Sequence, residues 1–156
     1  MIYTVTMNPS LDYLLSLPAL QAGETNRSAA ERLVAGGKGI NVSKMLYNLG
    51  TDSIIWGFAG GFSGEELCRQ LTAAGLRQEL IFLHNGNTRI NVKLSAGQET
   101  EVNAKGPQAE EEALQIFYRR LEALTAEDYV VLSGSLLPGM PCNSYRQIMQ
   151  QLQGRG

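Results

Sequence analysis

Three glycines and a lysine precede a segment with helical periodicity in the stretch AGGKGINVSKMLYNLG, residues 35–50. Glycines at the start of a helix leave backbone N–H groups accessible at the positive end of the helix dipole, and they let a polar ligand approach closely. The stretch therefore predicts a site for hydroxyl groups or an anion. It matches neither a Walker A loop nor a dinucleotide-binding fingerprint, because both glycine spacings are absent. Alternatively, the glycines serve only tight packing of the helix.

A carboxylate is the second candidate ligand group. Asp12 lies just beyond the first predicted strand, in the stretch NPSLD. Sites in open parallel sheets lie at strand ends, and a carboxylate there can accept hydrogen bonds from hydroxyl groups. An ordinary turn aspartate is the alternative interpretation.

Other kinds of site lack the residues they require. His84 is the only histidine, and the two cysteines, Cys68 and Cys142, are isolated from each other. A Ser/His/Asp triad, a metal site and a disulfide framework are therefore not expected.

Composition narrows the class of protein. The chain has 156 residues, 44% of them hydrophobic and 18% charged, with a net charge of −2. This length suits one α/β core or part of one. No basic stripe predicts nucleic-acid binding, and no segment predicts a membrane span or a secretion signal, so a cytoplasmic protein is expected.

Strands and helices are predicted to alternate in the first half of the chain. Residues 2–7, IYTVTM, form a β-branched run typical of a strand. Residues 53–60, SIIWGFAG, are continuously apolar, which is typical of a strand buried on both faces of a parallel sheet. Between them, apolar residues at helical spacing predict a helix that ends at Gly50. These residues are Val42, Met45, Leu46 and Leu49.

The next segments extend this pattern and then interrupt it. Ser63 and Glu66 have the spacing of a capping box, which predicts a helix from Ser63 to about Ala74, and residues 79–83 predict another strand. Residues 88–94 and 99–104 alternate apolar and polar around a turn, which predicts an antiparallel hairpin with one solvated face. A small sheet added to a larger parallel one is therefore expected.

Three elements are predicted in the last part of the chain. The acidic run 110–112 suits the start of a helix, and Arg119 and Arg120 suit its end. A buried strand from Tyr129 is expected to run into a Ser/Gly/Pro loop, and residues 143–153 predict an amphipathic helix.

Five stretches together resemble the N-terminal half of the ribokinase-like sugar kinases of the phosphofructokinase-B family. They are MNPSLD, AGGKGINVSKMLYNLG, TRINVK, TEVN and SGSLLPG. The resemblance implies a three-layer α/β/α fold with a mostly parallel sheet and a small β-sheet lid, whose strands are expected within residues 12–35 and 87–105. The TRINVK and TEVN pair points to the branch that phosphorylates phosphosugars. The lid of such kinases often pairs with a second subunit, so a homodimer is expected.

The resemblance also assigns roles to single residues. Asp12, Gly36, Gly37 and Asn41 are expected to hold the sugar hydroxyls. Lys38 and Arg89 become candidates for the substrate's phosphate, and a planar guanidinium suits bidentate phosphate binding. The alternatives are a solvated strand charge at Arg89 and a loop lysine that points to water at Lys38. Asn103 and Glu101 either line the same pocket or face outward. Ser133 and Gly134 belong to a loop below the sugar, in which Leu137 replaces the family's usual proline.

Family members continue into a second half with an ATP site, a magnesium-associated N-x-x-E motif and a G-A-G-D loop that supplies the general base. None of these motifs is present, so the chain is expected to be truncated, with the catalytic aspartate beyond Gly156. The favoured reaction is ATP- and Mg²⁺-dependent phosphorylation of fructose 1-phosphate, and tagatose 6-phosphate is the alternative substrate. A non-catalytic sugar-phosphate-binding module and an unrelated nucleotide-binding α/β domain are the competing hypotheses.

Overall fold

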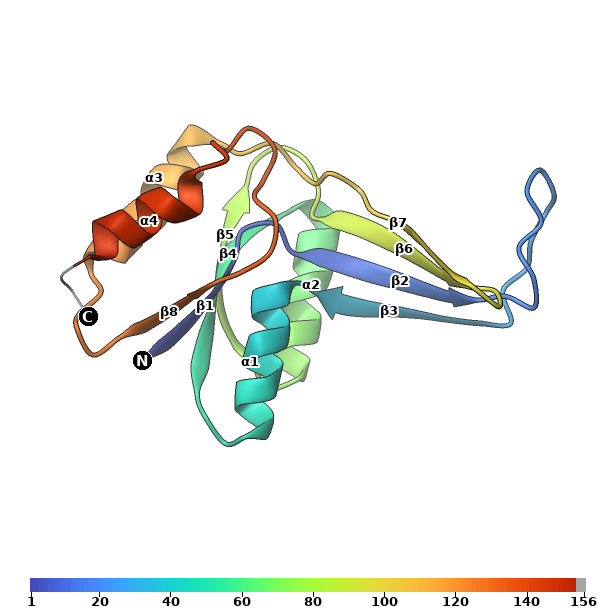
Figure 1. The fold of residues 1–156 in the computed structure, drawn as a ribbon, viewed down its shortest axis with the longest axis horizontal. Helices are drawn as coiled ribbons and strands as arrows, with labels where there is room; N and C mark the ends of the chain where they lie inside the picture. Colours follow the sequence, from blue (N-terminus) through green and yellow to red (C-terminus); the bar gives the residue numbers. More distant parts are fainter. Residues whose placement is uncertain (154–156) are drawn as a thin grey trace.

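The computed structural model describes residues 1–153, which form two four-stranded sheets (Figure 1). The first sheet is parallel throughout and has the strand order β5-β4-β1-β8. Its strands are β1 (Ile2–Thr6), β4 (Ser53–Gly60), β5 (Arg77–Leu83) and β8 (Tyr129–Leu132). Every residue of β4 is buried, as its continuous apolar sequence predicts.

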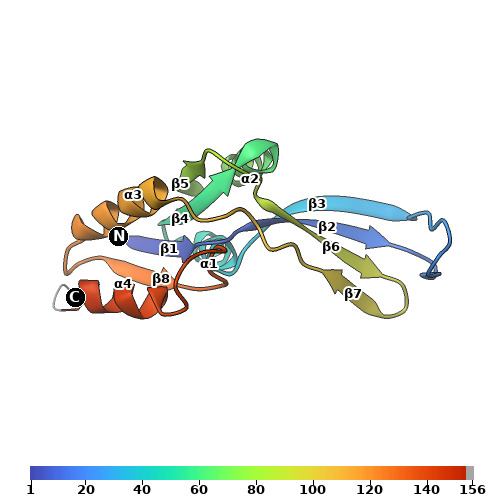
Figure 2. The same ribbon diagram turned by 90° about the horizontal axis from the view of Figure 1, so that it is seen from above.

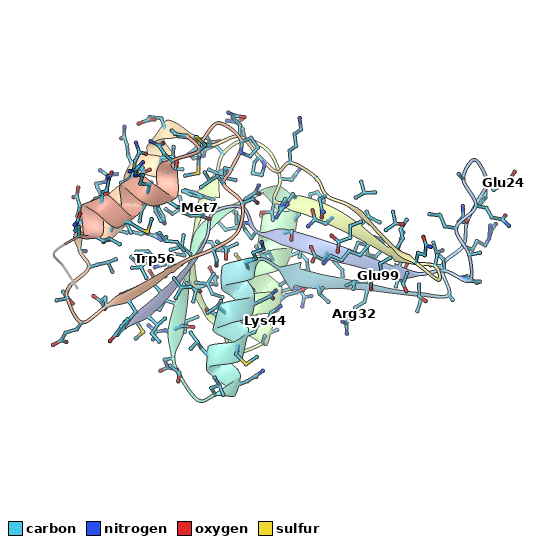
Figure 3. All side chains as sticks on the ribbon, in the orientation of Figure 1. Met7, Glu24, Arg32, Lys44, Trp56 and Glu99 are labelled. Atoms are coloured by element: carbon cyan, nitrogen blue, oxygen red, sulfur yellow. The ribbon has the colours of Figure 1, made fainter. Side chains whose placement is uncertain are left out.

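Helices cover both faces of the parallel sheet. α1 (Lys38–Asn48) and α2 (Gly61–Ala73) pack on one face, and α3 (Glu111–Glu122) and α4 (Ser144–Leu152) pack on the other. Met7 and Trp56 belong to the apolar core on the α3/α4 side (Figure 3). The predicted three-layer α/β/α arrangement is therefore confirmed. None of the helices in residues 1–153 is long and apolar enough to cross a membrane.

The second sheet projects away from the helix-covered sheet (Figures 1 and 2). Its strand order is β3-β2-β6-β7, with β2 and β6 parallel and the other neighbours antiparallel. The strands are β2 (Ser10–Ser16), β3 (Ala30–Gly36), β6 (Arg89–Ser95) and β7 (Glu99–Val102). The predicted hairpin of residues 88–104 is the β6–β7 pair, so the expected small sheet is present.

The apolar residues at helical spacing in α1 are not its most buried residues. Met45 and Leu49 are 60% and 70% exposed. The helix instead packs through a side that includes Gly39 and Ser43, and a Cβ atom at residue 39 would lie 2.7 Å from the Val5 carbonyl oxygen. Periodicity thus predicted the helix correctly but did not identify its packing side, because close approach to β1 requires small residues there.

The predicted capping box at Ser63 is also wrong. α2 begins at Gly61, two residues earlier, and Ser63 makes no capping hydrogen bond. Its buried hydroxyl donates to the Thr88 carbonyl oxygen at 2.7 Å, and Glu66 pairs with Arg69. Ser63 therefore ties the helix to the chain entering β6, which no local pattern reveals.

β8 is not the buried strand that its apolar sequence predicts. It pairs with β1 and forms one edge of the described sheet, and Tyr129 is 71% exposed. Position in the sheet, which the sequence of β8 does not encode, decides its exposure.

Candidate functional site

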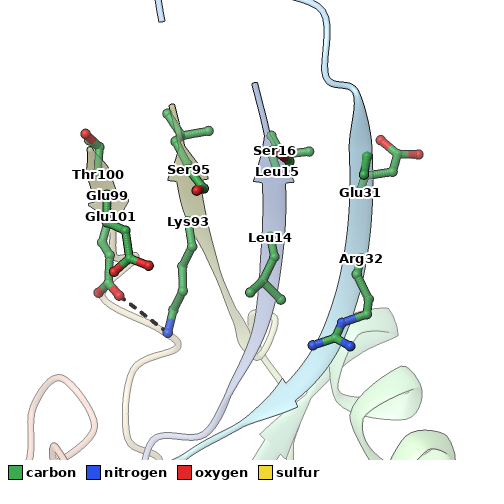
Figure 4. Close-up of a pocket in the computed structure, with 12 residues that line it drawn as sticks. Leu14, Leu15, Ser16, Glu31, Arg32, Lys93, Ser95, Glu99, Thr100 and Glu101 are labelled. Carbon is green, nitrogen blue, oxygen red and sulfur yellow. Dashed lines mark ion pairs between the residues drawn. The ribbon is translucent and has the colours of Figure 1, made fainter. Parts of the chain in front are cut away.

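A polar cavity of about 370 Å³ lies where the second sheet meets the start of α1 and the loop after β8. Its lining consists only of polar side chains and glycines: Thr6, Asn8, Ser10, Asp12, Gly37, Lys38, Asn41, Arg89, Asn91, Lys93, Glu101, Asn103, Gly134 and Ser135. A larger hollow of about 580 Å³ lies farther along the second sheet (Figure 4). Its lining mixes the apolar side chains of Leu14, Leu15 and Leu94 with polar and charged ones, whereas the smaller cavity has no apolar side chain in its lining.

The sequence predicted that Asp12 lies at the end of the first parallel strand. The structure corrects this, because Asp12 lies inside β2 of the second sheet. The reason is that the chain turns at Asn8-Pro9 and enters the second sheet at Ser10. Burial would raise the pKa of the Asp12 carboxyl, but hydrogen bonds from Ser10, Lys93 and Asn91 outweigh it and hold that pKa below its usual value. Asp12 is therefore a carboxylate at neutral pH.

Lys93 joins two carboxylates across the second sheet. Its Nζ atom lies 3.1 Å from Asp12 Oδ2 and 3.4 Å from Glu101 Oε1, and the second contact is drawn in Figure 4. Lys93 and Glu101 are paired in the β6–β7 register. The hydrogen bond to Asp12 raises the pKa of Lys93. The positive charge of Lys93 is therefore already balanced within the site.

Arg89 and Lys38 are the two cations in the lining whose charge is not balanced by a carboxylate among the described residues. Arg89 donates from Nε to the Asn8 carbonyl oxygen at 3.2 Å and from Nη1 to the Ala104 carbonyl oxygen at 3.5 Å. Within residues 1–153, neither Arg89 nor Lys38 forms an ion pair with a carboxylate. These two positive charges are therefore available to an anionic ligand.

The glycines before α1 serve packing and the site together. Gly37 has φ +140° and lines the cavity. A Cβ atom at Gly36 would lie 2.9 Å from Asp12 Cγ, so this glycine leaves room for the carboxylate without lining the cavity itself. The Ile40 N–H donates to Thr6 Oγ1 at 3.1 Å, which satisfies one of the amides at the helix start. The glycines therefore do serve close packing, and the binding of hydroxyls or an anion by this stretch stays a prediction.

The remaining candidates separate into two groups. Gly134, Asn103 and Glu101 line the cavity, and the Asn103 amide donates to Glu101 Oε2 at 3.3 Å. Ser133 does not line it; its hydroxyl is buried and has no hydrogen-bond partner within residues 1–153. Leu137, the departure from the family's proline, is buried in the α3/α4 core.

Sequence reasoning missed several lining residues, of which Asn91 and Lys93 matter most. In a strand, alternate side chains point to the same face, so Arg89, Asn91 and Lys93 share one face of β6. This alternation is visible in the stretch TRINVK and could have identified both. Thr6, Asn8 and Ser10 were missed because ordinary strand and turn residues carry no comparable signal.

The fold and cavity define an α/β protein with a polar pocket whose lining combines a carboxylate with cationic side chains. The family model described as "pfkB family carbohydrate kinase" matches residues 5–156, and the chain belongs to this family. It is 41% identical over 150 residues to a 1-phosphofructokinase of Bacillus subtilis, covering 96% of this chain and 49% of the relative. The chain is also 37% identical over 153 residues to a 1-phosphofructokinase of Borreliella burgdorferi, and the match covers 97% of this chain and 50% of that relative.

A solved structure shares the same architecture. It is phosphofructokinase-2 from Escherichia coli in complex with fructose-6-phosphate, with 26% identity and a TM-score of 0.91 over 99% of this chain and 52% of that chain. The chain therefore spans about half the length of the relatives it matches.

Proposed function

We propose that this chain is the phosphosugar-binding part of an ATP-dependent carbohydrate kinase, and that its substrate is fructose 1-phosphate. The observation that carries the proposal is one cavity holding a fixed carboxylate, Asp12, and two cations without carboxylate partners, Arg89 and Lys38. A carboxylate accepts hydrogen bonds from sugar hydroxyls, whereas the cations match a phosphate. A bare sugar would require no such cations.

We assign each group of the substrate to residues that line the cavity. Asp12, Asn41 and Gly37 hold the sugar hydroxyls, and Gly36 leaves the space that the Asp12 carboxylate needs. Arg89 and Lys38 bind the phosphate already on the substrate. Gly134 and Asn103 close the cavity from the loop after β8 and from the end of β7, and the Tyr145 hydroxyl holds that loop by donating to the Ser133 carbonyl oxygen at 3.2 Å.

ATP and Mg²⁺ belong to the proposed reaction, but the described residues do not fit them. No group of three or more His, Cys, Asp or Glu side chains within residues 1–153 could hold a metal ion, and the glycine-rich stretch lacks a phosphate-loop spacing. We therefore propose that the nucleotide, the metal and the general base are held by residues other than those described. The role derived for these residues is to bind and orient the acceptor sugar.

The substrate assignment rests on the names of the curated relatives together with the cation pair. Tagatose 6-phosphate is the second candidate, since it also carries one phosphate and a free primary hydroxyl. Comparing kcat/KM of the whole protein for the two sugar phosphates tests the assignment. A higher value for tagatose 6-phosphate would overturn it. Absence of turnover with either, together with retained binding, would favour a non-catalytic sugar-phosphate-binding module.

We also propose a homodimer through the second sheet, because its two faces differ in chemistry. The face opposite Asp12 and Asn91 carries an apolar row in register across the sheet. The row consists of Leu33, Tyr13, Val92 and Val102, and Val102 is exposed. Burying this face against a second copy would remove apolar surface from water.

A further inference from the structure

The two oxygens of the Asp12 carboxylate are unequally occupied. Oδ1 accepts hydrogen bonds from Ser10 Oγ at 2.7 Å and from Asn91 Nδ2 at 3.0 Å. Oδ2 contacts only Lys93 Nζ, at 3.1 Å, among the described residues. A carboxylate oxygen has two lone-pair sites, so Oδ1 is saturated and Oδ2 retains one site.

The two donors to Oδ1 are held by the second sheet. Ser10 is 2% exposed and Asn91 is 5% exposed, so water does not compete for their hydrogen bonds. Asn91 and Asp12 are paired in the parallel β2–β6 register, and Ser10 lies two residues before Asp12 on the same face of β2. The orientation of the carboxylate is therefore fixed by two neighbouring strands.

When the Asn91 side chain donates to Asp12, its own amide oxygen is left without a hydrogen bond among the described residues. A carboxylate only accepts hydrogen bonds, so Asn91 must present its amide hydrogens to Asp12. Its Oδ1 atom is buried and has no partner among the described residues. An unpaired buried amide oxygen is destabilising. Fold stability therefore does not explain Asn91, whereas the bond to Asp12 does.

We propose that Ser10 and Asn91 are positioning residues that occupy Oδ1 of Asp12 and so leave Oδ2 to accept a hydrogen bond from a substrate hydroxyl. This inference rests on the proposed function of Asp12 as a sugar ligand. Gly36 supports the same arrangement, because a Cβ atom there would lie 2.8 Å from Ser10 Oγ.

Three charged groups act on Asp12 from the elements packed around it. Lys93 approaches from β6, Glu101 on β7 pairs with Lys93, and the Nζ atom of Lys44 on α1 donates to the Ala35 carbonyl oxygen at 2.6 Å. Lys44 also interacts electrostatically with Asp12. Substitutions at Ser10 and Asn91 leave all three charges in place, so their effects isolate the hydrogen bonds.

The test compares Ser10→Ala and Asn91→Leu with two controls in the 156-residue chain. Ser16→Ala makes the same change farther along the same face of β2, and Ser10→Thr retains the hydroxyl. The Asp12 carboxyl carbon is titrated by NMR. We expect its midpoint to rise in Ser10→Ala and in Asn91→Leu, because each loses a donor to the charged form, and to stay unchanged in both controls.

Ligand binding is measured in parallel by calorimetry, with fructose 1-phosphate and with inorganic phosphate as probes. We expect the dissociation constant for fructose 1-phosphate to rise about tenfold in each of the two variants, the scale of one charge-assisted hydrogen bond. Phosphate binding should not change, because Arg89 and Lys38 are untouched.

The outcomes separate this inference from the proposed function. An unshifted Asp12 titration in Ser10→Ala would overturn the positioning role. A shifted titration with unchanged fructose 1-phosphate affinity would uphold positioning but overturn sugar binding by Asp12. If Asn91→Leu is unfolded, as loss of its dispersed amide spectrum would show, the comparison of Ser10→Ala with Ser10→Thr alone tests the positioning role.

Discussion

Asp12 and Lys93 form an ion pair between two parallel neighbouring strands, with 3.1 Å between Oδ2 and Nζ. This pair sets the electrostatics of the cavity, because it neutralises Lys93 and leaves Arg89, on the same strand and face, as a free positive charge. Two lysine or arginine residues four apart on one strand therefore have different tasks. One holds a protein carboxylate, and we propose that the other holds the substrate's phosphate.

Arg89→Ala is expected to weaken fructose 1-phosphate binding by about 2 kcal/mol, the scale of a lost charge-assisted hydrogen bond. Calorimetry on the chain and KM in the whole protein measure the effect. Arg119→Ala, at an exposed position of α3, is the matched control and should change neither quantity. An unchanged affinity in Arg89→Ala would remove Arg89 from the phosphate site.

Asp12→Asn is expected to lower kcat/KM of the whole protein without unfolding it. The amide keeps the size of the side chain but lacks the charge, and one of its two oxygens becomes a donor. Kinetics and the melting temperature are measured together. Normal kinetics accompanied by a large fall in melting temperature would indicate that Asp12 is structural.

Acid stability is expected to depend on Asp128, which accepts from the Met1 amino group at 2.8 Å. The amino group, with two hydrogen bonds from Thr125, lowers the pKa of Asp128 to about 2. A lowered folded-state pKa stabilises the protein above the unfolded pKa of about 3.9, and this contribution is lost as pH falls toward about 2. Asp128→Asn should therefore lower the melting temperature more at pH 7 than at pH 2. Equal effects at both pH values would contradict this linkage.

Val102→Asp is expected to reduce self-association, because it places a charge in the exposed apolar row of the second sheet. Ser95→Asp is the control, because Ser95 on β6 lies on the other face of the second sheet from Val102, and it should leave association unchanged. Light scattering of the chain over a concentration series makes the comparison. If wild type and Val102→Asp show the same molar mass, the second sheet is not the interface.

The 156-residue chain alone is expected to release no ADP from ATP in the presence of fructose 1-phosphate. The described residues offer neither a metal-binding cluster nor a G-A-G-D loop. A coupled ADP-release assay with increasing ATP measures this directly. Sugar-dependent release would show that a general base lies within these 156 residues.

The sequence by itself determined the elements whose signals are local. The apolar run of residues 53–60 is the buried strand β4, and Gly50, with φ +74°, follows the end of α1 as its glycine signal predicts. The alternation of residues 88–104 likewise specified the β6–β7 hairpin. The five family stretches identified the fold class because they combine turn, glycine and polar residues at fixed spacing.

Only the tertiary structure decided which faces are buried and which polar groups meet. Helical periodicity identified an apolar side of α1, yet close approach of the helix to β1 buries Gly39 and Ser43 instead. Asn91 lies 79 residues from Asp12 and reaches it only because β2 and β6 pair in parallel. Periodicity is a property of one segment, whereas the register between distant strands is selected by packing of the whole fold. The sequence therefore predicted individual candidate residues, but it did not predict the hydrogen bonds and ion pairs between them.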